Sequence, residues 1–169
     1  MRPLNFLLAS WLVGWMQPSL AASVDERDMK AALIYNFSVY TTWPESPDKV
    51  FNICMFEADQ ESLNEALLER KVLNGKPVQV RSIHHVDEVK TCQVLFMEEA
   101  SIRNDQQLRQ QLQKHSVLFV HHGQKQTDAS MIDIQLVDKR YSFSINHQAA
   151  KDANLTLSSK LLKLATRVY

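Results

Sequence analysis

The chain has 169 residues, with 19 lysines and arginines against 19 aspartates and glutamates, so its formal net charge at pH 7 is zero. A chain without a basic excess gives no sign of nucleic-acid binding, although a neutral balance still allows a local basic patch, and this length suits one compact domain with its own apolar core. Only three glycines are present, which excludes the glycine-rich loops that hold nucleotide phosphates, so we expect no nucleotide cofactor.

The N-terminal segment is typical of a secretory leader. Arg2 precedes a mainly apolar run over residues 4–16, and Ser19 and Ala21 match the small residues of a cleavage site. An uncleaved membrane anchor is the alternative, but the run is shorter than the 18 or more apolar residues of a spanning helix. We expect a signal peptide over residues 1–22, and an exported chain with 18 basic against 19 acidic side chains, a net charge of −1.

The first half of the exported chain reads as alternating helices and strands. Residues 25–40 predict a helix, with Met29, Leu33, Phe37 and Tyr40 as its inner stripe and a second apolar side at Ala31, Ile34 and Tyr35. Residues 50–56 predict a buried strand and residues 60–69 a helix with Leu63, Leu67 and Ala66 inward. A turn at Asn74 and Gly75 precedes a strand over residues 78–83, and residues 84–90 form a short helix or loop.

The second half continues this alternation and then changes. Residues 92–97 and 116–120 predict buried strands on either side of a polar helix over residues 105–114. Apolar and polar residues then alternate over residues 132–136 and 141–145, which predicts a hairpin, although the turn lacks an Asn-Gly pair. Asn146 is expected to cap a helix through residue 151, and Ser158 or Ser159 a last helix with Leu161, Leu162, Ala165 and Val168 inward.

The predicted fold is therefore a layered α/β/α domain. Strands that alternate with helices pair mainly in parallel, and short apolar strands fit a sheet that is covered on both faces. We expect a mixed sheet of about six strands with the C-terminal hairpin at one edge.

Cys54 and Cys92 are the only cysteines, and we expect them to form a disulfide because exported thiols meet an oxidising compartment. This bond would close a loop of about 38 residues and stabilise the fold by up to about 4 kcal/mol. Two separate buried thiols are the alternative, since the sequence does not show that their Cβ atoms meet. A bonded cysteine cannot act as a thiolate nucleophile.

Metal binding and catalysis find little support in the sequence. His84 adjoins His85 and His121 adjoins His122, but neighbours in an extended strand point to opposite faces, so each pair offers one ligand per face. We expect polar surface histidines and no metal site. Glu98 and Glu99 adjoin at a strand end, which usually forms a solvated corner, and no motif of a nucleophilic enzyme is present. We expect no catalytic residues.

Tyr40 and Trp43, at the end of the first helix, are the candidate partner-binding residues. Exposed aromatic side chains of this kind are rigid anchors at protein interfaces. The alternative is that they pack on their own sheet, as aromatic residues at such corners commonly do.

Three segments resemble the YfiR/HmsC-like family of periplasmic proteins. The first covers residues 30–37 (KAALIYNF) and continues to Thr42-Trp43-Pro44. The second is residues 92–96 (CQVLF), and the third comprises residues 143–146 (FSIN), Ala149-Ala150 and residues 155–162 (LTLSSKLL). The resemblance spans nearly all of residues 23–169, in the order of the family's own pattern.

This resemblance implies a periplasmic repressor without catalytic activity of its own. Such a protein binds the periplasmic part of an inner-membrane diguanylate cyclase, and thereby lowers cyclic di-GMP and biofilm formation. It also implies a homodimer and, in some systems, an outer-membrane partner that removes the repressor. Some members carry a second cysteine pair in the later half, which this chain lacks. A periplasmic small-molecule sensor, or a periplasmic enzyme of unrecognised type, is the alternative.

Overall fold

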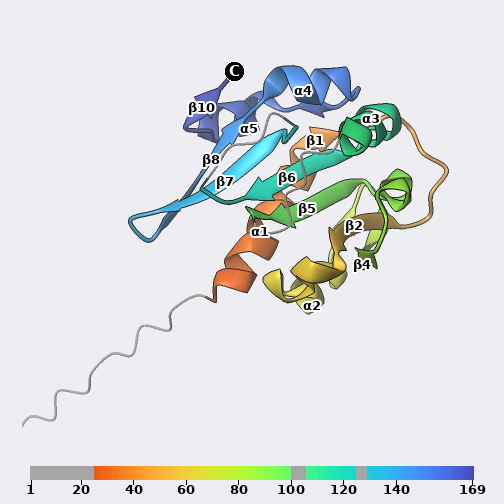
Figure 1. The fold of residues 1–169 in the computed structure, drawn as a ribbon, viewed down its shortest axis with the longest axis horizontal. Coiled ribbons are helices and arrows are strands. Elements are labelled where there is room, and N and C mark those ends of the chain that lie inside the picture. The colour runs from red at the N-terminus through yellow and green to blue at the C-terminus, as the bar shows by residue number, and fades with distance from the viewer. Residues whose placement is uncertain (1–24, 100–105, 125–128) are drawn as a thin grey trace, which may run out of the picture.

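A computed structural model describes residues 25–99, 106–124 and 129–169. Its main feature is a mixed sheet with the strand order β10-β8-β7-β6-β5-β2-β4-β3 (Figure 1). The strands are β2 (Phe51–Phe56), β3 (Val72–Leu73), β4 (Lys76–Ile83), β5 (Val94–Glu98), β6 (Leu118–His122), β7 (Ile132–Val137), β8 (Arg140–Ile145) and β10 (Arg167–Val168). The six longer strands match the six that the sequence predicts, and β3 and β10 add two short edges.

The centre of the sheet is parallel. Strands β4, β2, β5, β6 and β7 run in one direction, and β8 returns antiparallel to β7. At the two edges, β3 pairs antiparallel with β4 and β10 pairs parallel with β8. Central parallel strands are buried on both faces, which explains their nearly continuous apolar sequences.

Helices cover both faces of the sheet, and each face has its own apolar cluster. The helices are α1 (Glu26–Val39), α2 (Glu65–Glu69), α3 (Gln106–His115), α4 (His147–Asp152) and α5 (Ser159–Leu164), with 3-10 helices η1 (Glu57–Ser62) and η2 (Val86–Thr91). Helices α1, α2, α4 and α5 contribute to one cluster, and α3 and η2 contribute to the other. Strand β5 supplies both, with Val94 and Phe96 in the first and Leu95 and Met97 in the second. The predicted α/β/α layering is confirmed.

The inner stripe of α1 differs from the prediction. Its buried residues are Lys30, Ala31, Ile34, Phe37 and Ser38, so that only Phe37 of the expected stripe is fully buried. Two polar side chains are buried because each has a partner: the Lys30 ammonium bonds to Glu98, and the Ser38 hydroxyl donates to the Ile34 carbonyl oxygen. Apolar periodicity therefore places the helix correctly, and Ala31 and Ile34 of the predicted second apolar side are more deeply buried than most of the predicted inner stripe.

Two other predicted helices are also corrected. The segment predicted as one helix over residues 60–69 is η1 followed by α2, and it buries Leu63 and Leu68 while Ala66 is exposed. The last helix, α5, ends at Leu164, and Val168 is exposed on β10 rather than buried in a helix. Both segments end in short elements, where a few hydrogen bonds outweigh apolar periodicity.

The hairpin and the helix caps agree with the sequence. Strands β7 and β8 are joined by Asp138 and Lys139, which both have positive φ and together form the two-residue turn that suits a twisted hairpin. The Asn146 side chain accepts from the backbone of Ala149 at the start of α4, and Ser158 is the residue that caps α5.

Replacing Phe37 with alanine is expected to lower the free energy of unfolding by about 3 to 5 kcal/mol. The ring is 1% exposed and lies edge-on to Phe143, with ring centroids 4.9 Å apart, so the change leaves a cavity between α1 and the sheet. Urea denaturation would measure the loss. The control is Val39→Ala on the same helix, because Val39 is 47% exposed and its truncation should change stability by less than about 0.5 kcal/mol.

Candidate functional site

The chain leaves α1 through a short two-stranded sheet that sets its direction. Strand β1 (Thr41–Thr42) pairs antiparallel with β9 (Thr156–Leu157). The Thr41 hydroxyl donates to the Phe37 carbonyl oxygen at 2.7 Å, and the Ser158 backbone N–H donates to the Tyr40 carbonyl oxygen at 2.9 Å. These bonds fix the backbone immediately before Trp43.

Trp43 lies at the amino ends of the neighbouring strands β2 and β5. Its indole N–H donates to the Gln93 carbonyl oxygen at 3.1 Å. Its ring stands edge-on to Phe51, with centroids 5.1 Å apart and planes at 88°. The side chain remains half-buried, so the indole is held on two sides while part of it faces solvent.

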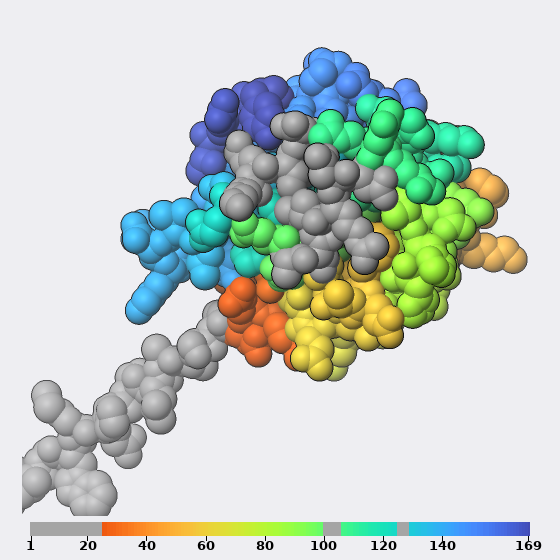
Figure 2. All heavy atoms as spheres, in the orientation of Figure 1, coloured from red at the N-terminus to blue at the C-terminus, as the bar shows by residue number. Residues whose placement is uncertain are grey.

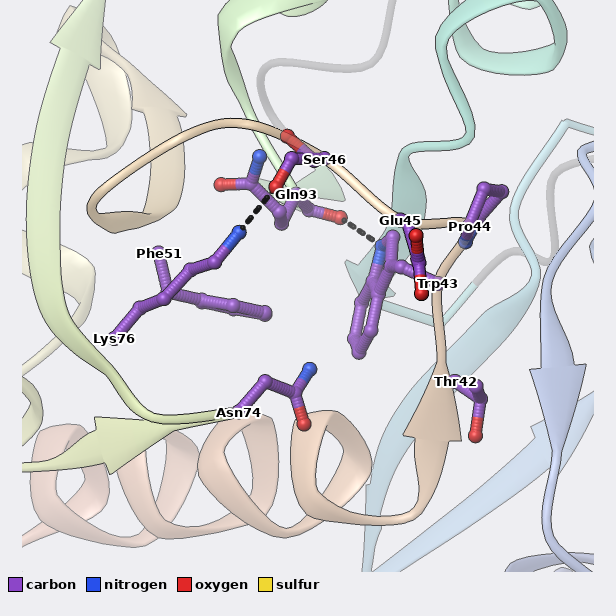
Figure 3. A pocket seen from close by; sticks show the side chains of 9 residues that line it. All are labelled: Thr42, Trp43, Pro44, Glu45, Ser46, Phe51, Asn74, Lys76 and Gln93. Atoms are coloured by element: carbon purple, nitrogen blue, oxygen red, sulfur yellow. Dashed lines mark hydrogen bonds between the residues drawn. The ribbon is translucent and has the colours of Figure 1, made fainter.

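Hollows lie on both sides of this indole, and we call Trp43 with the two hollows the Trp43 corner. The larger hollow has a volume of about 370 Å³ and is shown in Figure 3. It is lined by Thr42, Trp43, Pro44, Glu45, Ser46, Phe51, Asn74, Lys76 and Gln93. The Lys76 ammonium donates to the Ser46 carbonyl oxygen at 3.0 Å, which ties β4 to the loop that follows Trp43.

The smaller hollow, about 290 Å³, lies between the Trp43–Asp48 loop and the carboxyl ends of η2 and α3. Lys90, Lys114 and His115 line its helical side, and Asp48 lines its loop side. Burial, followed by the charges of Lys114 and Lys90, lowers the pKa of His115 below its usual 6.5. The helical wall therefore carries the two lysine charges, opposite Asp48 on the loop.

The two aromatic residues that the sequence selects occupy different places. Both side chains pack against the main apolar cluster, but only Trp43 also lines the two hollows. Phe51 and Gln93, which hold the indole, were not predicted, because each reads as an ordinary strand residue. Only the pairing of β2 with β5 brings them beside Trp43.

The profile of the YfiR/HmsC-like family matches residues 27–166. The chain belongs to the YfiR/HmsC-like family. The matched residues include α1, the Trp43 corner and nearly all of the sheet. Membership in this family places the chain among periplasmic regulatory proteins.

Comparison with individual proteins adds little to this assignment. No curated protein matches the YfiR/HmsC-like chain significantly. Among solved structures, the ABC domain from Streptococcus pneumonia in complex with L-Trp is 10% identical, with a TM-score of 0.43, and the match covers 73% of this chain and 56% of that one. A conserved domain protein from Vibrio cholerae is also 10% identical, with a TM-score of 0.47 and coverage of 82% and 60%. The chain spans little more than half of either.

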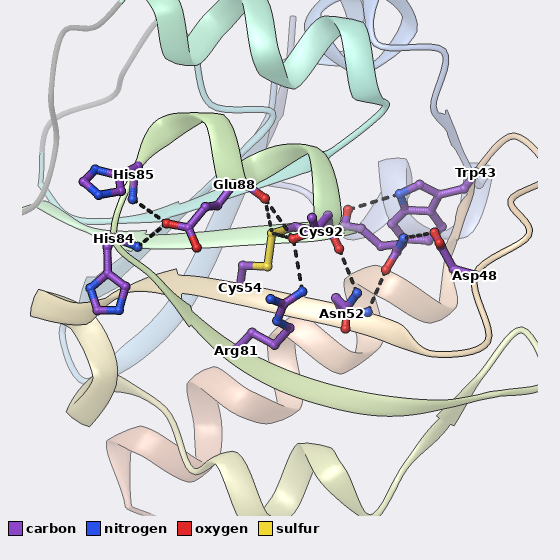
Figure 4. The surroundings of a disulfide bond; sticks show 11 residues. Trp43, Asp48, Asn52, Cys54, Arg81, His84, His85, Glu88 and Cys92 are labelled. Carbon is purple, nitrogen blue, oxygen red and sulfur yellow. Dashed lines mark hydrogen bonds between the residues drawn. A yellow bond between two sulfur atoms is a disulfide. The ribbon is translucent and has the colours of Figure 1, made fainter.

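A disulfide joins Cys54 and Cys92 in this YfiR/HmsC-like protein, with Cα atoms 5.8 Å apart (Figure 4). Both residues are buried, Cys54 in the middle of β2 and Cys92 at the end of η2. At the other end of η2, the Glu88 carboxylate accepts from the backbone N–H groups of His84 and His85 at 2.9 and 2.8 Å, which lowers the pKa of Glu88. A covalent bond and a cap thus hold η2 on the sheet.

The expectation that the histidines lie on the surface is wrong for His121. This residue is 0% exposed, and its Nδ1 lies 2.9 Å from Asp133, which also accepts from the Ser130 hydroxyl at 2.6 Å. Gly123, two residues after His121, has no room for a side chain, because a Cβ atom there would lie 2.9 Å from the His121 Nε2 atom. The buried pair holds the end of β6 against β7.

The expectation of a solvated corner at Glu98 and Glu99 is wrong for Glu98, whose carboxylate is partly buried and bonded. It bonds to the buried Lys30 ammonium at 2.6 Å and to the Nδ1 atom of His122 at 2.7 Å. Burial disfavours the carboxylate, but the bonds from His122 and Lys30 outweigh it and lower the pKa of Glu98. Nearby, burial and the carboxylates of Glu26 and Glu98 raise the pKa of Tyr141 to about 12.

The described residues contain neither a cluster of metal ligands nor a membrane-spanning helix. Within residues 25–99, 106–124 and 129–169, no three His, Cys, Asp or Glu side chains gather as metal ligands. In the same ranges, no helix is both long and apolar enough to cross a membrane. The proposed signal peptide over residues 1–22 lies outside them.

Replacing both cysteines with alanine is expected to lower the free energy of unfolding by about 2 to 4 kcal/mol, because the bond closes a loop of 38 residues. Urea denaturation with and without reductant would measure this. Reductant should destabilise the native protein and leave the Cys54→Ala/Cys92→Ala variant unchanged. A variant as stable as the oxidised protein would contradict the structural role of the bond.

Glu98→Gln is expected to destabilise the protein by about 1 to 3 kcal/mol at pH 7, because Lys30 then loses its charged partner on the sheet. The folded-state pKa of Glu98 lies below its usual 4.5, so its carboxylate stabilises the fold above pH 4.5. This contribution disappears as the pH falls through the folded-state pKa. Unfolding curves at a series of pH values should therefore show a difference between variant and native protein that narrows below pH 4.5, and a constant difference would refute the assignment.

Proposed function

We propose that this protein is a periplasmic repressor of an inner-membrane diguanylate cyclase. It would bind the cyclase's periplasmic domain, hold the cytoplasmic catalytic domain inactive, and so lower cyclic di-GMP and biofilm formation. The supporting observation is the match to the YfiR/HmsC-like family over residues 27–166. The chain itself catalyses nothing in this proposal.

The Trp43 corner is the proposed contact surface. Large aromatic side chains dominate binding energy when they are ordered before the partner arrives, because little conformational entropy is lost on binding. The hydrogen bond to Gln93 and the edge contact with Phe51 provide this order for Trp43. The hollows on both sides of the indole can accept side chains from the partner, and Tyr40 supports the corner through its backbone.

Repression sets a quantitative requirement on this contact. The repressor must bind the inactive cyclase more tightly than the active one, since equal affinity would leave the equilibrium unchanged. Moving the cyclase from mostly active to mostly inactive needs about 5.5 kcal/mol of preference. An indole that contacted only the inactive state of the cyclase would contribute to this preference.

The assembly around this contact is also a proposal. A signal peptide over residues 1–22 would export the chain, and residues 23–169 would act as one domain. A homodimer and an outer-membrane partner that withdraws the repressor follow from the family resemblance. The disulfide between Cys54 and Cys92 would then serve stability alone.

Trp43→Ala is expected to raise cyclic di-GMP at least fivefold in cells that produce the cyclase, by removing the anchor of the interface. Because Trp43 also packs on Phe51, Glu45→Arg is a second variant, which places a bulky charge beside both hollows without opening the core. The matched control is Glu69→Arg, an equal charge change on the exposed face of α2.

Circular dichroism must show that each variant is folded, and cyclic di-GMP is measured in cell extracts. Full repression by folded Trp43→Ala and Glu45→Arg proteins would reject the Trp43 corner as the contact. Unchanged cyclic di-GMP after complete deletion of the protein would reject the proposed function itself.

Sensing of a small molecule is the second candidate function. The larger hollow falls within the 300 to 1,000 Å³ of typical ligand pockets, and it combines two aromatic rings with the polar groups of Lys76, Asn74 and Gln93. A ligand there would compete with the cyclase for the same indole. Thermal-shift screening of periplasmic metabolites, with Glu45→Arg as the negative control, distinguishes a sensor from a plain repressor.

A further inference from the structure

Charge is distributed very unevenly along this nearly neutral chain. Residues 25–99 contain 14 acidic and 8 basic side chains, whereas residues 136–169 contain 2 acidic and 6 basic ones. The later stretch forms one side of the molecule: the hairpin of β7 and β8, helices α4 and α5, and the edge strand β10. The near-zero net charge therefore conceals a strongly basic side.

Exposed apolar residues gather on the same side. Seven large apolar side chains are substantially exposed in the described residues, and five of them fall within residues 136–169: Leu136, Val137, Leu164, Val168 and Tyr169. Leu164, at 66%, is the most exposed of the seven. Such a concentration marks an interaction surface, because isolated exposed apolar residues would be spread over the whole protein.

The basic and apolar groups are interleaved. On α5 the buried side is Leu161, so that Lys160, Lys163 and Leu164 face outward together. On β10 the Arg167 guanidinium lies over the Tyr169 ring, 5.0 Å from its centroid, and Val168 points to the other face of the strand. At the hairpin turn, Lys139 and Arg140 follow Val137 and the exposed Asp138.

We name this surface the β8–β10 edge and define it by the residues Leu136, Val137, Lys139, Arg140, Lys160, Lys163, Leu164, Arg167, Val168 and Tyr169. In Figure 2 the hairpin and the dark-blue C-terminal residues both project on the same side of the molecule. Strand β8 runs between them. Only its last two residues, Ser144 and Ile145, pair with β10, so the first half of β8 is not covered by β10. The edge is therefore basic and carries several exposed apolar side chains.

We propose that the β8–β10 edge binds the anionic surface of a lipid bilayer. Proteins that bind to membrane surfaces combine lysine and arginine with leucine, valine and tyrosine. The cations contact lipid phosphates, and the apolar side chains enter the membrane interface. The inference rests on the proposed function in one respect only: that function places the protein in the periplasm, beside the inner membrane.

The charges argue against a second copy of the chain as the occupant. In a twofold-symmetric contact the same patch meets itself, so its five basic side chains would face five. Like charges that are brought together in this way oppose association, and Asp138 is the single acidic side chain in residues 136–140 and 160–169 that could offset them. An anionic bilayer supplies that compensation over the whole edge.

Sedimentation with vesicles tests the proposal. The purified chain without residues 1–22 is mixed with phosphatidylethanolamine vesicles that contain about 30% phosphatidylglycerol, or with neutral phosphatidylcholine vesicles. Binding is expected to the anionic vesicles only, and to weaken about tenfold between about 0.05 and 0.5 M NaCl, because screening removes the phosphate contacts.

Two sets of variants locate the surface. Lys160→Glu/Lys163→Glu should reduce binding at least about tenfold, whereas the matched reversal Lys49→Glu/Arg70→Glu should leave it unchanged. All four residues are exposed, so the folds should be retained. Leu164→Ser should weaken binding, and the control Val72→Ser, at a site that is 60% exposed on the opposite sheet edge, should not.

Three results would overturn the proposal: equal binding to neutral vesicles, equal loss with the control reversal, or a change of oligomeric state with Leu164→Ser in the absence of lipid. The last would identify the edge as a protein contact. Because no cyclase is present, this experiment fails or succeeds independently of repression. Normal vesicle binding with no effect on cyclic di-GMP would reject the proposed function and retain this inference.

Discussion

Burial of the parallel strands on both faces is the constraint on which the rest of the structure depends. In β2, β5 and β6 nearly every side chain is inaccessible, and successive residues alternate between the two apolar clusters. Such strands have no solvent-exposed face, so a helical layer must cover each side. The connections between them are consequently long, and their ends form the loops and corners in which the polar and aromatic features of the molecule lie.

The disulfide and the buried polar groups act at the margins of this framework. Cys54 and Cys92 join the central strand to the helix that covers one face, while Glu98 and Lys30 join the central sheet to the helix that covers the other. Each bond fastens a covering layer at one point. Apolar burial drives the layers together, and these directional contacts decide how each helix is rotated upon the sheet.

This division explains what the sequence could and could not predict. Continuous apolar runs such as residues 92–97 identify central strands, and the Asn146 and Ser158 caps identify helix starts, because both signals are local. The burial of Lys30 on α1 was not predicted, since it depends on the Glu98 carboxylate, which lies 68 residues away in the chain. His121 was misjudged for the same reason: its partner Asp133 lies on a neighbouring strand. Trp43 is singled out by its residue type alone, and the Phe51 and Gln93 groups that orient it depend on tertiary structure.

The bond between the Ser158 N–H and the Tyr40 carbonyl oxygen has a geometric consequence. Ser158 caps α5, and Tyr40 immediately precedes the β1 segment that leads to Trp43. One residue therefore fixes the position of the helix that bears Lys160 and Leu164 relative to the backbone that carries the indole. A molecule resting on a bilayer through α5 would present Trp43 at a single height and in a single direction above the lipid. The search for a membrane-anchored partner would then be reduced from three dimensions to motion within a plane.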